Sequence, residues 1–299
     1  MANPKNAAWY GGGLGMFLLP GTNFVDNSLF YIDDTDGLDT NDGLTPTTAF
    51  QTITYAQSQA VAAPAINYFI VLRYGNDATL DAVWPIPITV ANTQLIAASM
   101  GSFIPDVNIV ANGAFGCLSI EADGIRVQGF MIRPGAAPGI VFDGEHGNQS
   151  IFDCRFDMGT YGIYSAWGGV GWGLDIERCS FVGNLTAGGI SLQDDPASIR
   201  IHNNVFKCNQ DAGQIAIDIL NGGDAEITSN QFSIEEDAVT GYAITLQATT
   251  NSAFVNNNWA ATGVAVPGVN PYRDLGGAVH PNNWGLNYMG VTATYPVAV

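Results

Sequence analysis

Apolar and polar positions alternate in short runs along this chain, and the runs recur at a nearly constant spacing. Between residues 125 and 259 an aliphatic or aromatic residue is followed five positions later by a large aromatic residue, and this pattern occurs six times. The pairs are Ile125/Phe130, Ile151/Phe156, Ile176/Phe181, Ile201/Phe206, Ile227/Phe232 and Phe254/Trp259. Successive aromatics lie 26, 25, 25, 26 and 27 residues apart. Self-similarity with a period of roughly 20–50 residues predicts a stack of equivalent units.

A second row of apolar residues keeps the same period. Ile190, Ile217 and Ile244 follow one another at intervals of 27 residues, and Gly139-Ile140 and Gly162-Ile163 precede them. Each period holds short runs with the alternation typical of strands, separated by Gly, Asn and Asp. Helical spacing is missing from the repeats, which excludes helical-repeat solenoids. The pattern predicts an all-β, single-stranded parallel β-helix whose coils stack about 4.8 Å apart.

The position two residues before each aromatic belongs to the predicted turn. It holds, in order, Gln128, Cys154, Cys179, Asn204, Asn230 and Asn257. Asn tolerates the left-handed backbone of a tight bend, and stacked amides hydrogen-bond along the axis, which predicts an asparagine ladder. Cys154 and Cys179 share one register and are expected to pack as neighbouring thiols rather than as a disulfide.

The aliphatic–x–x–Asn–x–aromatic coil resembles the right-handed parallel β-helix of the pectate-lyase-like superfamily. The resemblance implies a right-handed solenoid with a short N-terminal capping helix and extended terminal arms. Within that superfamily, the chain looks similar to phage and viral β-helix structural or appendage proteins. Its coils do not reproduce the family's lyase or polygalacturonase motifs, so the balance favours a non-enzymatic protein.

The sequence divides into four segments. Residues 1–30 form an apolar arm, 31–65 a first strand with an Asp-rich turn and a capping helix, 66–260 the solenoid, and 261–299 a C-terminal capping or interface segment. Thr47 or Thr48 is the predicted cap of the helix. Its apolar stripe consists of Ala49, Ile53, Ala56 and Ala60. The arm is expected to bury the apolar residues Trp9, Tyr10, Phe17, Leu18 and Leu19 against the first coil or a neighbouring subunit.

The net charge of −18 argues against nucleic-acid and anionic-membrane partners. The N-terminus lacks a basic segment followed by an uninterrupted apolar core, so a secretory signal is not expected. Together with the resemblance, this predicts a protein made in a host cytoplasm and incorporated into a virion. The expected partners are other virion or assembly subunits, in a homo-oligomer such as a trimer.

Catalysis would need carboxylates on the outer face of neighbouring coils. Aligning the Gly-Ile strands places one row outward: Val141, Tyr164, Ser191, Asp218 and Thr245. The candidate catalytic cluster for a polysaccharide lyase or glycoside hydrolase is Asp194, Asp195, Asp218 and Arg200. Turn chemistry explains the same aspartates without catalysis, and we favour that interpretation.

Two further groups suggest binding sites. The residues Asp34, Asp36, Asp39 and Asp42 could hold calcium, although the terminal Glu of an EF-hand is missing. A turn explains them equally, so no cofactor is expected apart from this calcium alternative. The aromatic residues Tyr164, Trp167 and Trp172 surround a Gly-rich loop. They suit stacking on a glycan, burial in a subunit interface, or local packing.

Three functional hypotheses follow. The leading one is a non-enzymatic structural component of a virion, such as a tail, fibre or capsid-decoration protein. The alternatives are a polysaccharide-degrading lyase or hydrolase acting in a solenoid groove, and a glycan-binding adhesion module that contacts a host-surface polysaccharide.

Overall fold

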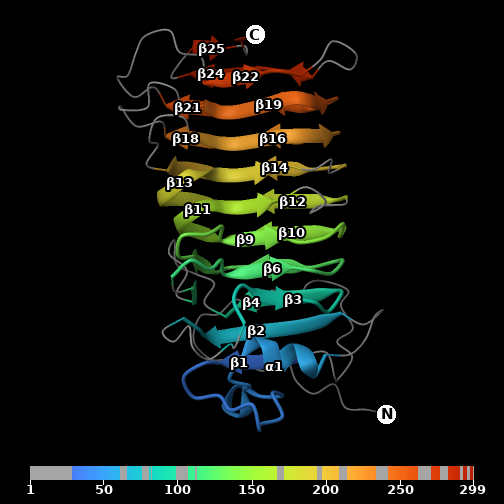
Figure 1. Ribbon diagram of the computed structural model, residues 1–299, viewed down its shortest axis with the longest axis vertical. Helices are drawn as coiled ribbons and strands as arrows, with labels where there is room; N and C mark the ends of the chain where they lie inside the picture. The colour runs from blue at the N-terminus through green and yellow to red at the C-terminus, as the bar shows by residue number, and fades with distance from the viewer. Residues whose placement is uncertain are drawn as a thin grey trace.

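The protein is a tall column of stacked coils, with a short helix at its N-terminal end (Figure 1). The structure is a computed structural model of the chain. It describes residues 29–60, 66–75, 81, 83–98, 107–111, 113–166, 172–193, 197–208, 214–233, 242–261, 271–276, 282–289, 292–294 and 297–298. Residues 1–28 of the predicted arm, including Trp9, Tyr10, Phe17, Leu18 and Leu19, lie outside these residues, while Leu29 and Phe30 belong to the first strand.

One side of the column, here called the first face, is a parallel sheet of ten strands in the described residues. In sheet order these are β1 (Leu29–Asp33), β2 (Asn67–Arg73), β4 (Thr93–Ala97), β7 (Arg126–Gln128), β10 (Gln149–Phe152), β12 (Leu174–Glu177), β14 (Arg200–His202), β17 (Glu226–Thr228), β20 (Phe254–Asn256) and β23 (Asn283–Trp284). Because β1 pairs in parallel with β2, the predicted first strand is already part of the solenoid.

The remaining strands form a second sheet with two branches, which share β11 (Arg155–Ser165) and β13 (Ser180–Leu192). The second face contains β5 (Asn108–Val110), β8 (Met131–Arg133), β15 (Val205–Cys208), β18 (Gln231–Ser233), β21 (Trp259–Ala261), β24 (Asn287–Met289) and β25 (Thr292–Thr294). The third face contains β3 (Ile86–Ile88), β6 (Leu118–Ile120), β9 (Ile140–Phe142), β16 (Ile215–Gly223), β19 (Tyr242–Asn251), β22 (Tyr272–Asp274) and β26 (Val297–Ala298). The strand pairs between coils are parallel, and β25 closes antiparallel on β24. The parallel β-helix predicted from the sequence is confirmed.

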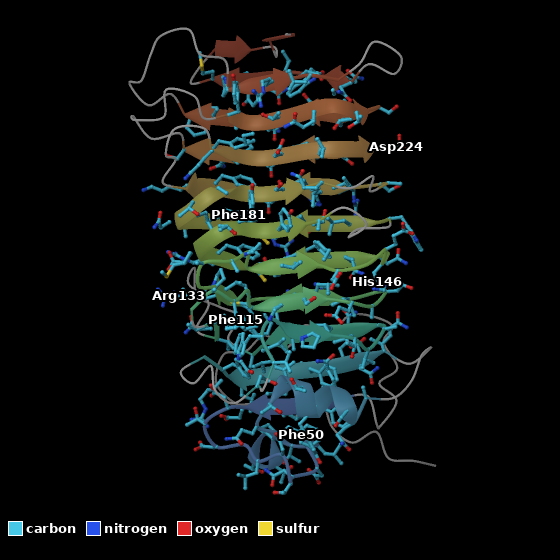
Figure 2. All side chains as sticks on the ribbon, in the orientation of Figure 1. Phe50, Phe115, Arg133, His146, Phe181 and Asp224 are labelled. Atoms are coloured by element: carbon cyan, nitrogen blue, oxygen red, sulfur yellow. The ribbon has the colours of Figure 1, made fainter. Side chains whose placement is uncertain are left out.

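A stack of phenylalanine rings fills the core behind the second face. Phe156, Phe181, Phe206 and Phe232 lie with ring centroids 4.6–4.9 Å apart and planes within 12° of parallel. Figure 2 labels Phe181 in the body of the column. The rings explain the Gly-Ile motif of the third face, because a Cβ on Gly162 would lie 2.6 Å from the Phe181 ring, and one on Gly189 would lie 2.7 Å from the Phe206 ring.

The asparagine ladder exists, but its last members differ from the prediction. Asn204, Asn230, Asn258 and Asn287 are fully buried, and each of the first three donates its amide N–H to the side-chain oxygen of the next at 2.9–3.0 Å. Asn257, predicted as the third member, is exposed instead and has a φ of 56°. At Asn204, Asn230 and Asn258 the residue with left-handed backbone is the preceding one (Asn203, Ser229 and Asn257), so these ladder asparagines are explained by their amide hydrogen bonds alone.

The predicted pairing is wrong in the first and last repeats. Phe232 pairs with Ala260 rather than Trp259, so Trp259 lies on the outside and is 43% exposed. Phe156 pairs with Ile132 rather than Phe130. At Trp259 the shift is one residue, which moves the side chain to the other face of the strand. At Phe130 the shift is two residues, and Phe130 stays buried. Cys154 and Cys179 do share a register, and both are buried free thiols.

The N-terminal helix is shorter than predicted and begins later. It consists of a 3₁₀ turn, η1 (Pro46–Thr48), followed by α1 (Ile53–Ser58). Thr52, not Thr47 or Thr48, caps α1 by accepting the Tyr55 N–H at 3.0 Å. The expected apolar stripe is confirmed at Ala49, Ile53 and Ala56, which are buried. At the other end the solenoid continues past residue 260, since β22 and β23 pair with β19 and β20.

Candidate functional site

The outward row predicted on the third face is present and extends by one coil. Tyr164 pairs with Val141 and Ser191, Ser191 with Asp218, and Asp218 with Thr245. Arg273 on β22 pairs with Thr245 and continues the row. We call this part of the third face the Tyr–Asp face. Its partly exposed residues are Tyr161, Tyr164, Asp218 and Arg273, and Ser191 and Thr245 are fully buried between them.

Two stacked tyrosines form one end of the Tyr–Asp face. The rings of Tyr161 and Tyr164 lie 5.3 Å apart with their planes at 21°. Both leave β11 on its outer side because Gly162, between them in the chain, faces the phenylalanine stack. Burial raises the pKa of Tyr161, and the negative charge of Asp218 adds to the shift. Tyr161 is therefore a neutral hydroxyl donor at physiological pH.

Asp218 lies at the centre of the face and is partly buried. Gln247 donates to its Oδ1 at 2.8 Å, and Gln193 from the neighbouring coil donates to the Ser191 hydroxyl at 2.7 Å. Burial raises the pKa of Asp218, an effect that Gln247 and the charge of Arg273 oppose. A carboxylate flanked by planar amides offers several hydrogen-bond acceptors and donors at one place on the surface.

The other end of the Tyr–Asp face combines a cation with a third tyrosine. The Arg273 guanidinium carbon lies 4.2 Å from the centre of the Tyr242 ring, a cation–π contact. Thr245, between Asp218 and Arg273, is fully buried, and its hydroxyl has no hydrogen-bond partner in the described part of the chain. A buried polar group without a partner is uncommon in a folded protein.

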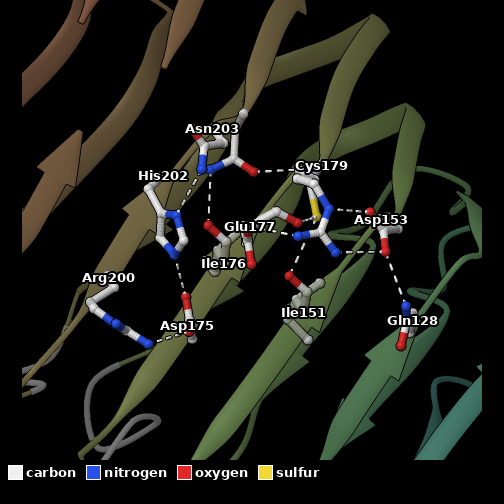
Figure 3. A network of polar contacts seen from close by, with 12 residues as sticks. Gln128, Ile151, Asp153, Asp175, Ile176, Glu177, Cys179, Arg200, His202 and Asn203 are labelled. Atoms are coloured by element: carbon white, nitrogen blue, oxygen red, sulfur yellow. Dashed lines mark hydrogen bonds and ion pairs between the residues drawn. The ribbon is translucent and has the colours of Figure 1, made fainter. Parts of the chain in front are cut away.

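The first face carries a network of charged side chains, drawn in Figure 3. Asp153 accepts two hydrogen bonds from Arg178 of the next coil at 2.8 and 3.0 Å. Asp175 accepts a hydrogen bond from Arg200 at 2.6 Å, and its other oxygen lies 2.9 Å from His202 Nε2. Each pair joins one coil to the next about 25 residues later, which indicates a structural role. Exposed pairs of this kind each contribute about 0–1 kcal/mol.

A shallow cleft of about 460 Å³ lies at the edge of the first face, with Asp175, Arg200, Asp224 and Glu226 on its walls. Figure 2 shows Asp224 at the edge of the column. Both oxygens of Asp175 are already engaged by Arg200 and His202. This arrangement stabilises the surface and leaves Asp175 without a free oxygen for proton transfer.

The four aspartates considered for calcium are each bound to protein donors. Asp34 accepts the Gly75 N–H at 2.7 Å, Asp36 pairs with Arg73, Asp39 accepts three hydrogen bonds from Gln51 and Thr52, and Asp42 accepts the Thr48 hydroxyl at 2.6 Å. Within the described residues, no three His, Cys, Asp or Glu side chains gather to hold a metal ion. These hydrogen bonds make the loop a turn that is held against the start of α1.

Of the predicted catalytic residues, the two that the structure describes, Arg200 and Asp218, lie on different faces. Arg200 lies on the first face beside Asp175, whereas Asp218 lies on the third face. Asp194 and Asp195 fall outside the described residues, as does Trp167. Trp172 is 56% exposed, and its indole ring covers Gly147, where a Cβ would approach within 2.6 Å. Among the described residues of the Tyr–Asp face, Asp218 is the single carboxylate, while glycoside hydrolysis uses two.

Sequence reasoning grouped Tyr161 with the aromatic residues near the Gly-rich loop, but it missed Tyr242, Gln247 and Arg273. Extending the outward row by one more period from Thr245 would have suggested the region of Arg273, but the last coil is a residue longer. The stacking of Tyr161 on Tyr164 places two residues three positions apart on the same side of β11, which strand alternation does not indicate.

The described residues include no helix with the length and hydrophobicity needed to cross a bilayer. No protein-family model and no curated protein matches the sequence. Among solved structures, the chain is similar to a double mutant of the tailspike protein of E. coli bacteriophage HK620, with 13% sequence identity and a TM-score of 0.33. The match covers 75% of this chain and 52% of the tailspike chain, so the protein spans about half the length of that structure. The fold assignment rests on the strand pairing described above.

Proposed function

We propose that this protein is a non-enzymatic structural subunit of a virion, in which the solenoid is a rigid shaft within a tail, fibre or decoration assembly. The observation that carries the proposal is the continuity of the side-chain ladders along the axis. Ion pairs join coils between Asp153 and Arg200, phenylalanine rings between Phe156 and Phe232, and ladder asparagines between Asn204 and Asn287. Close-packed interiors of this kind transmit strain with little deformation.

The test is the mass of the full-length chain in solution, measured by light scattering. The proposal expects a homo-oligomer such as a trimer. It also expects this oligomer to dissociate, and the measured mass to fall accordingly, when residues 1–30 are removed. A monodisperse monomer at micromolar concentration, with and without these residues, would refute the assembly role. Small-angle scattering of the same samples would check for a rod whose cross-section does not change with concentration.

A second function, polysaccharide binding without cleavage, is favoured by the Tyr–Asp face. Stacked tyrosine rings beside a carboxylate and two amides combine an apolar surface with hydrogen-bonding groups, as sugar recognition requires. We do not propose cleavage, because Asp218 has no second carboxylate beside it in the described chain and Arg200 belongs to another face. Incubation with host polysaccharides, followed by sizing of the products, would reveal any cleavage.

A further inference from the structure

The two lateral edges of the column carry opposite charge. Figure 2 shows Arg133 at one edge and both His146 and Asp224 at the other, in a view down the shortest axis of the molecule. Arg133 ends a strand of the second face, whereas His146 and Asp224 lie in bends that lead from the third face into the first. We call these two surfaces the second-face edge and the bend edge.

The second-face edge is basic and partly apolar. The described strands that build the second face contain three cations and one carboxylate, a net charge of +2: Arg133, Arg155, Lys207 and Asp157. Lys207 is exposed, and its ammonium group has no hydrogen-bond or ion-pair partner in the described part of the chain. Val205 and Trp259 point outward on the same face and are 40% and 43% exposed. The surface therefore suits a partner that is acidic and partly apolar.

The bend edge is acidic. Asp143 and Glu145 are exposed in the turn that contains His146, and Asp224 and Glu226 are exposed on the walls of the cleft described above. Within the described residues, none of these four carboxylates has a hydrogen-bond or ion-pair partner. The other charged pair of the cleft, Asp175 and Arg200, is already joined by an ion pair.

The opposite charges lie at matching heights along the axis. Arg133 and the turn with Asp143 and Glu145 belong to one coil, because β8 and β9 are consecutive strands, and Figure 2 shows His146 at nearly the height of Arg133. Lys207 follows β14 in its coil, and Glu226 begins the strand that pairs with β14 one coil later. A single coil spacing of about 4.8 Å separates these two levels.

We propose that copies of this chain associate side by side in the same orientation, with the second-face edge of one copy on the bend edge of the next. Lys207 enters the cleft beside Asp224 and Glu226, and Arg133 lies opposite the turn at 143–145. The net charge of −18 makes copies repel in orientations that bring acidic surfaces together.

A contact between two different surfaces is heterologous and closes into a ring only when the rotation between copies allows it. Because the two edges lie on opposite sides of the column, the copies form an open row or a ring of many members rather than a trimer. The inference rests on the assembly role proposed above and adds the contacting surfaces, the parallel orientation and the arrangement of the copies.

The experiment measures the mass of the full-length chain by light scattering over a range of protein and sodium chloride concentrations. The variants are Lys207→Glu, Glu226→Lys and the double exchange, which restores the original net charge. Thr47→Glu is the control, because it adds a negative charge at the exposed N-terminal end of the column, away from both edges. Thermal melting of every variant confirms that it is folded.

A carbodiimide, which joins an amine to a carboxylate that it touches, is applied to an equal mixture of isotopically light and heavy chains. The chain has two lysines, Lys5 and Lys207, so the cross-linked peptides are few and mass spectrometry can assign them. A peptide that contains one light and one heavy partner comes from two different copies.

The expected mass exceeds that of a trimer, rises with protein concentration and falls with salt, which screens exposed charges. Each single substitution should raise the concentration needed for association by about tenfold or more, and the double exchange should restore it. Thr47→Glu should leave association unchanged. Light–heavy cross-links should join Lys207 to Asp224 or Glu226.

Two results would overturn the inference. A trimer whose mass is the same in both single variants would overturn the pairing of the edges and leave the assembly role in place. A monomer at every protein and salt concentration would overturn both the pairing and the assembly role.

Discussion

Replacing Asn230 by leucine tests the ladder that holds the coils in register. Asn230 is fully buried, and its side chain makes four hydrogen bonds. Its amide donates to Ile201 O at 2.9 Å and to Asn258 Oδ1 at 3.0 Å. Its carbonyl oxygen accepts the backbone and side-chain N–H groups of Asn204, both at 3.0 Å. Leucine has a similar volume, so the substitution removes hydrogen bonds and leaves the packing nearly intact.

The cost follows from the groups that lose their partners. The Asn204 backbone N–H and the Ile201 carbonyl would remain buried, and the Asn204 amide would lose one acceptor while keeping Ile176 O at 3.0 Å. A buried polar group left without a partner costs about 1–3 kcal/mol. Two such groups predict a loss of about 2–6 kcal/mol in the free energy of unfolding, which is a large part of the stability of a typical domain.

The assay is urea unfolding followed by circular dichroism, with the slope of the transition compared between variants. Gln231→Leu is the control, because Gln231 is the next residue, carries the same amide and is exposed. It should change the free energy by at most about 0.5 kcal/mol. Equal stability of Asn230→Leu and Gln231→Leu would show that the ladder does not stabilise the solenoid, and the reasoning would fail.

Three further predictions concern the core, Asp218 and the Asp-rich loop. Phe206→Ala removes a ring from the middle of the stack and should cost about 3–5 kcal/mol in the same assay; a loss below 1 kcal/mol would mean that the stack collapses around the gap. Burial raises the pKa of Asp218 in the folded state, so folding favours the protonated acid. The protonated Asp218 therefore contributes stability below its unfolded pKa of about 3.8, and this contribution is lost as pH rises through the folded pKa. Asp218→Asn should therefore raise the melting temperature at pH 7 and give little gain near pH 3; a lower melting temperature at pH 7 would contradict this sign. Removing calcium with a chelator should leave the melting temperature unchanged, since the carboxylates at 34–42 have protein donors; a rise on adding calcium would instead support the calcium alternative.

The hydrophobic periodicity of the sequence was sufficient to predict the fold and the pairing of residues in the middle coils. The aromatic spacing between Phe156 and Phe232 predicted equivalent positions on successive coils, where the rings stack, and the Gly-Ile rows predicted which residues of the third face point outward. Both succeed because a coil of constant length places equivalent residues at equivalent angles around the axis. The neighbouring positions of Cys154 and Cys179 follow from the same constancy.

The same reasoning failed where the coil length changed. Trp259 and Asn257 were assigned by counting, but the last turn contains a different number of residues, and Ala260 and Asn258 take the inner positions. A shift of one residue preserves the composition of a repeat while reversing which side chains are buried. The predicted start of α1 was also wrong, because several threonines suit a helix cap and only the hydrogen bond that Thr52 accepts distinguishes it.

The sequence alone thus determined the architecture, because burial of a periodic apolar row requires stacking of equivalent coils. The Tyr–Asp face was decided by the tertiary structure. Tyr161 and Arg273 are more than a hundred residues apart in the chain, with Asp218 about midway, yet the stacking of coils brings all three onto one surface. The assignment of Arg200 to a different face from Asp218 likewise depends on where the chain bends between sheets. Such proximity depends on the length and direction of each turn, which the hydrophobic period does not encode.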